Sequence, residues 1–205
     1  MSYICLKRLI DIVLAVFLSI LFFPIWILIP LLILLESGRP IFYRHKRIGK
    51  DGKGFWLYKF RSMVVNADKV LLYNKRLLAE FKNGDWKLEN DPRVTKLGRL
   101  LRNLTIDEFP QLLNVLKGEM SIVGPRAYLR QELDEQTKKH TSTKKFIETI
   151  LSVKPGITGV WQTSGRNEIP FILRTKMDYD YAKSLSFRGD LKIILKTPKA
   201  MISKW

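Results

Sequence analysis

The sequence predicts one α+β domain, mostly helical, preceded by an apolar N-terminal segment. Three observations lead to this prediction. Residues 12–35 carry no charge, and a helix of that length reaches across the hydrocarbon core of a bilayer. Residues 40–63 contain two β-prone segments around a glycine-bounded turn. The rest consists of polar and amphipathic stretches of helical length separated by glycine and proline. We therefore divide the 205 residues into a membrane segment, 1–38, and a second, larger domain, 39–205.

The composition indicates a polyanionic partner. Lys and Arg number 36 against 19 acidic residues, a net charge of +17, which suits nucleic acid, anionic lipid or phosphate-bearing substrates. The single Cys5 excludes an internal disulfide and is typical of a reducing compartment. His45 and His140 are too few for a histidine zinc site, and the pattern holds no Ser-His-Asp triad.

The apolar run 12–35 either crosses a membrane as a bent helix or enters and leaves it on one side. Lys7 and Arg8 precede the run. The basic residues that follow it are Arg39, Arg44, Lys46, Arg47 and Lys50. Positive charges on both flanks hold both ends at the cytoplasmic face, which a straight span does not allow. Pro24 and Pro30 bend the helix, but transmembrane helices also tolerate proline, so the residues leave both topologies open. The run is too long for a removed signal peptide.

Residues 40–92 are expected to form a strand pair and then a helix. The strands are Pro40–Tyr43 and Phe55–Tyr58, with the turn at 49–52. Lys59 and Arg61 follow the second strand, where charges are ordinarily solvated. Asn66 is a candidate cap for one amphipathic helix that ends at Asn83-Gly84, and Asp91-Pro92 predicts a turn.

The central feature is a pair of adjacent carboxylates, Asp107 and Glu108. Arg99 and Arg102 precede the pair and Arg126 follows it in a Gly-Pro-Arg turn. An isolated Asp-Glu pair is ordinarily only a favourable helix start. Beside three arginines, however, one carboxylate can hold Mg²⁺, the other can attack phosphorus, and the guanidinium groups can bind phosphate oxygens.

Pro110 indicates where this pair lies. A proline deep in a helix clashes with the preceding turn, so the helix that runs to Lys117 should begin near Ile106 or Asp107. Both carboxylates would then occupy its first turn, where the macrodipole favours negative charge, and Gly118 would end it. Thr105–Glu108 also matches a capping box, although that arrangement places Pro110 too far into the helix.

The C-terminal third offers weaker signals. Residues 128–150 predict a polar helix with a solvated lysine face, and residues 154–159 predict a glycine-punctuated loop. Arg166 follows a glycine that permits a close approach to phosphate, without P-loop spacing. Asp178 belongs to an acidic cluster that is either a helix-surface feature or a contact to nucleotide or metal. The basic amphipathic tail 191–205 suits an anionic membrane surface or a core helix with snorkelling lysines.

Four stretches carry a family resemblance. Asn90–Arg99, Asp107–Arg126, Lys59–Met63 and Lys154–Gln162 together resemble the bacterial sugar transferase family, the monotopic polyprenyl-phosphate phosphoglycosyl transferases. These matches are long and span nearly the whole chain. The chain departs from the family pattern at Ala127, where a second proline is usual. Some members also mark the membrane break with Ser-Pro, where this chain has Phe23-Pro24.

The resemblance implies transfer of a sugar 1-phosphate from a UDP-sugar to undecaprenyl phosphate, with release of UMP, as the first step of surface glycan assembly. Asp107 would attack the β-phosphorus to give a covalent aspartyl phosphosugar, and Glu108 would hold Mg²⁺ or Mn²⁺. The substrate-binding residues would be Lys59, Arg61, Arg102, Arg126, Arg166 and Asp178.

The resemblance also favours the monotopic arrangement. Residues 1–38 would form a re-entrant helix-break-helix with its break at Pro24. The small catalytic domain would lie on the cytoplasmic face of the bacterial inner membrane, in contact with anionic phospholipid. We expect no nucleic-acid partner. The sequence leaves the oligomeric state open between monomer and homodimer, and no pattern in it specifies the sugar.

Two other functions fit parts of the sequence. A membrane-tethered nucleic-acid-binding protein explains the charge of +17 but gives the acidic pair no purpose, and its binding would depend steeply on salt. A membrane-bound, metal-dependent lipid-phosphate hydrolase would use the same carboxylates with water as acceptor. Product analysis with and without lipid phosphate distinguishes the hydrolase from the transferase.

Overall fold

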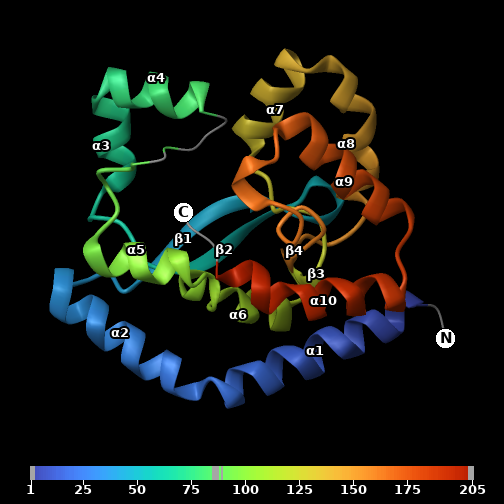
Figure 1. Cartoon of the computed structure of the whole chain (residues 1–205), viewed down its shortest axis with the longest axis horizontal. Coiled ribbons are helices and arrows are strands. Elements are labelled where there is room, and N and C mark those ends of the chain that lie inside the picture. The colour runs from blue at the N-terminus through green and yellow to red at the C-terminus, as the bar shows by residue number, and fades with distance from the viewer. Residues whose placement is uncertain (1–2, 85–87, 89, 203–205) are drawn as a thin grey trace.

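A computed structural model describes residues 3–84, 88 and 90–202 (Figure 1). These residues confirm the mostly helical α+β class, since the helices accompany only two small, two-stranded sheets. Figure 1 shows helices α1 and α2 lying along one side of the molecule, with the sheets and the other helices above them.

Helices α1 (Tyr3–Leu21) and α2 (Phe23–Ser37) meet at Phe22. No single described helix has the length and apolar character of a membrane span, but the two taken together do, with a 62° bend between them. Pro24 lies in the first turn of α2, where its missing N–H has no helical acceptor to lose. The break predicted at Pro24 is therefore present, and the proline begins the second helix.

Polar side chains on one face of α1 attach it to the rest of the fold. Arg8 donates to the carbonyl oxygens of Val115 and Leu116 at 2.6 and 3.0 Å. Asp11 is 4% exposed and accepts hydrogen bonds from Ser121 Oγ and Ile122 N, both at 2.9 Å. A buried carboxylate with two donors fixes both the rotation and the height of the helix.

The predicted strand pair is present, but its first strand begins and ends later than the predicted Pro40–Tyr43. Strands β1 (Phe42–Ile48) and β2 (Gly54–Phe60) are antiparallel, with Phe42 opposite Phe60, and the short helix η1 (Lys50–Gly52) turns the chain between them. Along β1, residues 42, 44 and 46 are exposed while 43, 45 and 47 are half-buried. This alternation places Arg47 on the inner face of the sheet.

The second sheet was not predicted. Strands β3 (Ser121–Val123) and β4 (Gly156–Thr158) are parallel, so part of the predicted loop 154–159 is a strand. The pairing requires glycine at its end, because a Cβ on Gly156 would lie 2.0 Å from the backbone nitrogen of Gly124.

Two predicted helices are interrupted. Residues 67–83 form α3 (Ala67–Tyr73) and α4 (Lys75–Asn83). The expected cap at Asn66 is wrong, because its φ is 60° and its side chain makes no capping bond. Asn74 caps α4 instead, accepting from Leu77 N at 3.0 Å. Residues 128–150 likewise contain two helices, α7 (Arg130–Lys139) and α8 (Lys144–Leu151), separated by η3 (Thr141–Thr143).

The other helices complete the walls around the sheets. They are α5 (Lys96–Asn103), η2 (Ile106–Glu108), α6 (Gln111–Lys117), η4 (Arg166–Glu168), α9 (Phe171–Lys183) and α10 (Phe187–Met201). Figure 1 shows α10 running above α1. The predicted amphipathic tail is thus helical as far as Met201, and residues 203–205 of that prediction lie outside the described part of the chain.

The main core joins the N-terminal helix to the catalytic elements. Its buried members include Ala15 of α1, Leu57 of β2, Val115 of α6 and Ile193 of α10. A second cluster packs α2 against β2 and α5 through Ile33, Phe60 and Leu101. Helices α1 and α2 therefore share apolar cores with the elements that carry the site.

Candidate active site

The carboxylate pair lies in a separate turn before the helix that runs to Lys117, not in that helix. Asp107 and Glu108 belong to the 3₁₀ turn η2, and α6 begins only at Gln111, with Pro110 as its N-cap. The prediction that both carboxylates lie in the first turn of the helix to Lys117 is wrong. The reason is Thr105, whose φ of 58° turns the chain between α5 and η2, and whose side chain does not cap the turn.

Two remote segments hold Thr105 in this conformation, which is rare for a β-branched residue. Its hydroxyl donates to the carbonyl oxygen of Met201 at 3.2 Å and accepts from Arg166 Nη2 at 2.8 Å. The C-terminal end of α10 and the start of η4 therefore position the turn that bears the carboxylates.

Lys59 lies between the two carboxylates. Its ammonium group is 2.5 Å from Glu108 Oε1 and 3.7 Å from Asp107 Oδ2. Burial raises the pKa of Asp107 above its usual value, with Lys59 opposing that shift. Burial acts on Glu108 in the same direction, but Lys59 and the nearby Arg166 and Arg126 lower its pKa by more, so it stays below its usual value.

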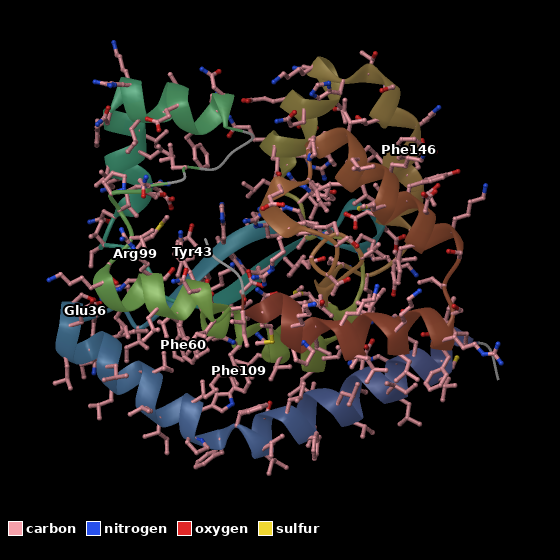
Figure 2. All side chains as sticks on the ribbon, in the orientation of Figure 1. Glu36, Tyr43, Phe60, Arg99, Phe109 and Phe146 are labelled. Atoms are coloured by element: carbon pink, nitrogen blue, oxygen red, sulfur yellow. The ribbon has the colours of Figure 1, made fainter. Side chains whose placement is uncertain are left out.

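One cavity of about 1860 Å³ brings the predicted site together. The residues predicted to act in the site that line this cavity are Lys59, Arg61, Arg102, Asp107, Glu108, Arg126 and Arg166. The cavity also reaches Leu18, Phe22 and Ile25 around the break between α1 and α2. Phe60 and Phe109 both contact Trp26 of α2, at ring-centroid distances of 6.0 and 5.2 Å, and Figure 2 shows them just above the α1–α2 pair.

The arginines have different surroundings. Arg102 Nε donates to Ser62 Oγ at 2.9 Å. Arg61 Nη2 donates to the carbonyl oxygens of Ser37 and Gly38, at 3.0 and 2.9 Å, and so caps the C-terminal end of α2. Arg99 is exposed and does not line the cavity, so its expected place beside the carboxylate pair is wrong.

Asp178 lies behind the cavity wall, on the buried face of α9. It is 1% exposed, and its Oδ2 accepts hydrogen bonds from Arg126 N at 3.1 Å and Tyr128 Oη at 2.8 Å. Burial raises the pKa of Asp178 to about 7. Asp178 therefore positions the backbone of Arg126 through a hydrogen bond. Its predicted contact with substrate stays a prediction.

The two carboxylates offer the oxygen ligands that a hard cation needs. Among the described residues, no group of three or more His, Cys, Asp or Glu side chains converges, which excludes an all-protein metal cage there. Asp107 Oδ1 is buried without a hydrogen-bond partner. Mg²⁺ is commonly held by one or two carboxylates together with substrate phosphates and water, and the pair fits that mode.

Sequence reasoning missed two charged residues and a tryptophan on the same cavity. Arg47, Glu132 and Trp161 also line it. Arg47 was missed because the predicted strand ended at Tyr43, whereas β1 runs to Ile48 and its two-residue period puts residue 47 on the inner face. Glu132 and Trp161 gave none, since the polar helix and the loop that hold them carry no spacing that indicates a site.

Comparison with known proteins identifies the family. The family model for bacterial sugar transferases matches residues 2–204. The chain is 40% identical over 202 residues to the undecaprenyl-phosphate galactose phosphotransferase of Salmonella typhimurium, covering 97% of this chain and 41% of that protein. It is 40% identical over 200 residues to the exopolysaccharide production protein ExoY of Sinorhizobium fredii, covering 95% of this chain and 84% of that protein.

A further relative is the UDP-glucose:undecaprenyl-phosphate glucose-1-phosphate transferase of Escherichia coli, 38% identical over 201 residues, with 94% of this chain and 39% of that protein covered. The chain thus spans about two fifths of the Salmonella and Escherichia relatives and most of the rhizobial one.

Proposed function

The chain belongs to the bacterial sugar transferase family, and from this premise we propose that it transfers a sugar 1-phosphate from a UDP-sugar to undecaprenyl phosphate, releasing UMP. Two of the relatives named above are named for sugar phosphate transfer to undecaprenyl phosphate, and the third is named for exopolysaccharide production. By the same reasoning the product would initiate a surface glycan.

One observation carries this proposal. The carboxylate pair and several cationic side chains line one part of a single cavity. The apolar residues around the α1–α2 break line another part of it. A nucleotide sugar is anionic, and a polyprenyl phosphate is anionic at one end and apolar along its chain. The cavity can therefore receive both substrates with their phosphates adjacent to Asp107.

In the proposed mechanism, Asp107 Oδ1 attacks the β-phosphorus of the UDP-sugar. The new oxygen–phosphorus bond forms as the bond from the β-phosphorus to the bridging oxygen breaks, and UMP leaves with the electron pair. An oxygen of the lipid phosphate then attacks the same phosphorus and releases the Asp107 carboxylate. Lys59 and Arg126 neutralise phosphate charge during both steps.

Glu108 would hold Mg²⁺ or Mn²⁺ beside the nucleophile Asp107. When bound, the ion supplies charge neutralisation for the diphosphate and the leaving UMP. Lys59 donates to Glu108 Oε1 in the structure, and its positive charge lowers the pKa of both carboxylates, which favours their ionised forms.

We further propose that α1 and α2 form a re-entrant hairpin at the cytoplasmic face of the bacterial inner membrane. The support is the bent apolar pair and the basic residues on both of its flanks. On α10, Phe187, Leu191 and Leu195 expose an apolar stripe at helical spacing, beside Lys192 and Lys196. That pattern suits an anionic lipid surface.

The covalent step is tested with the full chain, a panel of UDP-sugars and Mg²⁺, in the absence of lipid phosphate. We expect stoichiometric UMP release and a mass increase of one sugar phosphate on the peptide that contains Asp107, with ping-pong kinetics once undecaprenyl phosphate is added. Asp107→Asn should give no adduct. Unmodified protein, together with initial rates that require a ternary complex, would remove Asp107 as nucleophile. Continuous sugar phosphate release without lipid would indicate the hydrolase.

A further inference from the structure

A cluster of buried and half-buried charged side chains adjoins the carboxylate pair, and the steps described above use only one of its members. We call it the arginine cluster. It consists of Arg47 from β1, Arg126 from the Gly-Pro-Arg turn, and Arg174 from α9, arranged around Glu132 of α7. Arg126 and Arg174 both lie over the ring of Trp161, with Cζ at 5.3 and 5.2 Å from the ring centroid.

The cluster is held loosely around Glu132, which is 2% exposed. The carboxylate oxygens lie 3.9 Å from Arg47 Nη1, 3.8 Å from Arg126 Nε and 3.7 Å from Arg174 Nη1. A charge-assisted hydrogen bond between such groups is about 2.7–2.9 Å long. Each guanidinium group is therefore close enough to feel the charge of Glu132 and too far to donate to it.

Five donors in this cluster lack acceptors. Within the described part of the chain, Arg47 Nε, Arg126 Nε, Arg174 Nε and Nη1, and Trp161 Nε1 are buried without a hydrogen-bond partner. Unsatisfied buried donors are rare and costly, so a group of them indicates a missing acceptor. Asp178 Oδ1 also lacks a partner, but a single carboxyl oxygen cannot satisfy five donors.

The balance between the guanidinium and carboxyl groups of this region indicates that the missing acceptor is an anion. Three guanidinium groups face Glu132 and Asp178. Even with both carboxyl groups ionised, one positive charge is left over. A water molecule could accept hydrogen bonds here, but it would leave that charge in a buried site.

The cluster opens to the catalytic cavity. Arg47, Arg126, Glu132 and Trp161 line the same cavity as Asp107 and Glu108. Arg126 lies near both the carboxylate pair and the rest of the arginine cluster. Its positive charge lowers the pKa of Glu108 in the pair and the pKa of Arg47 in the cluster. A ligand with two adjacent phosphates can therefore place one phosphate at the carboxylate pair and the other at the arginine cluster.

We propose that Arg47 and Arg126 bind the α-phosphate of the nucleotide donor, so that the arginine cluster is the subsite of the leaving nucleoside monophosphate. This rests on the proposed function. When Asp107 attacks, the electron pair of the broken bond stays on the bridging oxygen, and the α-phosphate becomes a dianionic monoester. Planar guanidinium groups with free N–H donors bind such an ester through paired hydrogen bonds. Arg174, which lies over the ring of Trp161, adds its positive charge to the subsite.

The test is isothermal titration of the full chain with UMP, uridine, inorganic phosphate and farnesyl phosphate as a short polyprenyl phosphate. Arg47→Lys keeps the positive charge but removes the planar guanidinium group and its paired N–H donors. The matched control is Arg44→Lys on the exposed face of the same strand, where Arg44 lies over Trp56 at 5.0 Å. We expect Arg47→Lys to weaken UMP binding on the order of 10- to 100-fold and inorganic phosphate binding in parallel. Uridine and farnesyl phosphate binding, and the Arg44→Lys variant, should be unchanged.

A measurement on the unmodified protein guards against misfolding of the variant. Phenylglyoxal modifies accessible arginines, and tandem mass spectrometry locates the modified residue. UMP should protect Arg47, uridine should not, and Arg44 should react equally with and without UMP.

The outcomes are distinct. UMP affinity that is unchanged in Arg47→Lys, or no protection of Arg47 by UMP, overturns the subsite. Loss of farnesyl phosphate binding with UMP binding intact assigns the cluster to the lipid acceptor and also overturns it. Failure of the proposed function would appear elsewhere, as a wild-type protein that releases no UMP from any UDP-sugar.

Discussion

The Lys59 ammonium group lies 2.5 Å from Glu108 Oε1, while its distance to Asp107 Oδ2 is 3.7 Å. Lys59 is thus bound more closely to Glu108 than to Asp107. Asp107 keeps one oxygen without a partner, and burial raises its pKa. A buried carboxylate with an open oxygen is a better nucleophile than one held by a strong ion pair, provided that it is ionised.

Replacing Lys59 with Met should therefore shift the pH dependence of the reaction. Lys59 lowers the pKa of both Asp107 and Glu108, so its removal raises both. The acidic limb of the pH profile of UMP release should move to higher pH, and the maximal rate should fall on the order of 100-fold. Lys46→Met, on the exposed face of β1, is the control. An acidic limb at its wild-type position would show that Lys59 does not set the ionisation of the pair.

The carboxylate pair should make activity dependent on a hard divalent ion. We expect UMP release to stop in EDTA and to recover with Mg²⁺ or Mn²⁺, and Glu108→Gln to lose most of its activity at any metal concentration. Glu148→Gln, exposed on α8, should behave as wild type. Full turnover in chelator would exclude the metal-binding role of Glu108.

Asp178 should make folding stability depend on pH. Its pKa is raised from 3.8 to about 7, so its contribution to stability is fully present below pH 3.8 and is lost as pH rises to about 7. Asparagine at this position keeps an oxygen for Arg126 N and Tyr128 Oη but cannot ionise.

We therefore expect the stability of Asp178→Asn relative to the wild type to increase between about pH 4 and pH 7, by on the order of a few kcal/mol, in thermal unfolding. Asp180→Asn, exposed on the same helix, should show no such gain. A stability difference that is constant with pH would mean that Asp178 does not titrate in this range.

Gly98 allows α5 to pack on the backbone that follows β2. A Cβ at this position would lie 2.0 Å from Ser62 O, so Gly98→Ala must displace α5 and with it the contact of Arg102 with Ser62. Overpacking of this kind costs about 1–3 kcal/mol, measurable in chemical denaturation, and the transfer rate should fall as well. In the control Gly54→Ala, the nearest atom is Lys46 Cε at 3.2 Å, the end of a flexible chain. Equal stability of the two variants would contradict the packing argument.

Pro24 should control the topology of the N-terminal helices. In a Cys5→Ser background, cysteines at positions 2 and 50 should both be protected from an impermeant reagent in intact cells, because the proposed hairpin places both ends at the cytoplasmic face. Pro24→Ala permits a continuous helix through Phe22, and should convert part of the population to a spanning form in which position 2 reacts. Labelling of position 2 in the unmodified topology would rule out the re-entrant hairpin.

Local signals predicted the elements that depend on neighbours in sequence. The β1–β2 pair was predicted because alternation and a glycine turn are local. The β3–β4 pair was not, because three-residue strands show no period and the pairing depends on Gly124 and Gly156 meeting from distant parts of the chain. The carboxylates were identified by residue type, but their turn was misplaced because nothing in the sequence marks Thr105 as left-handed. Asp178 was predicted to be either a helix-surface feature or a contact to nucleotide or metal, and its burial on α9 was not predicted because burial is decided by packing.

The bond between Thr105 and the carbonyl oxygen of Met201 also bears on how the protein is made. The two residues are 96 positions apart, so this bond cannot form on the ribosome until α10 has emerged from the exit tunnel. The α1–α2 pair is synthesised long before that. A nascent chain can thus reach its cellular location while its catalytic turn is still incomplete. We expect nucleotide-sugar consumption to begin only after translation of the last helix.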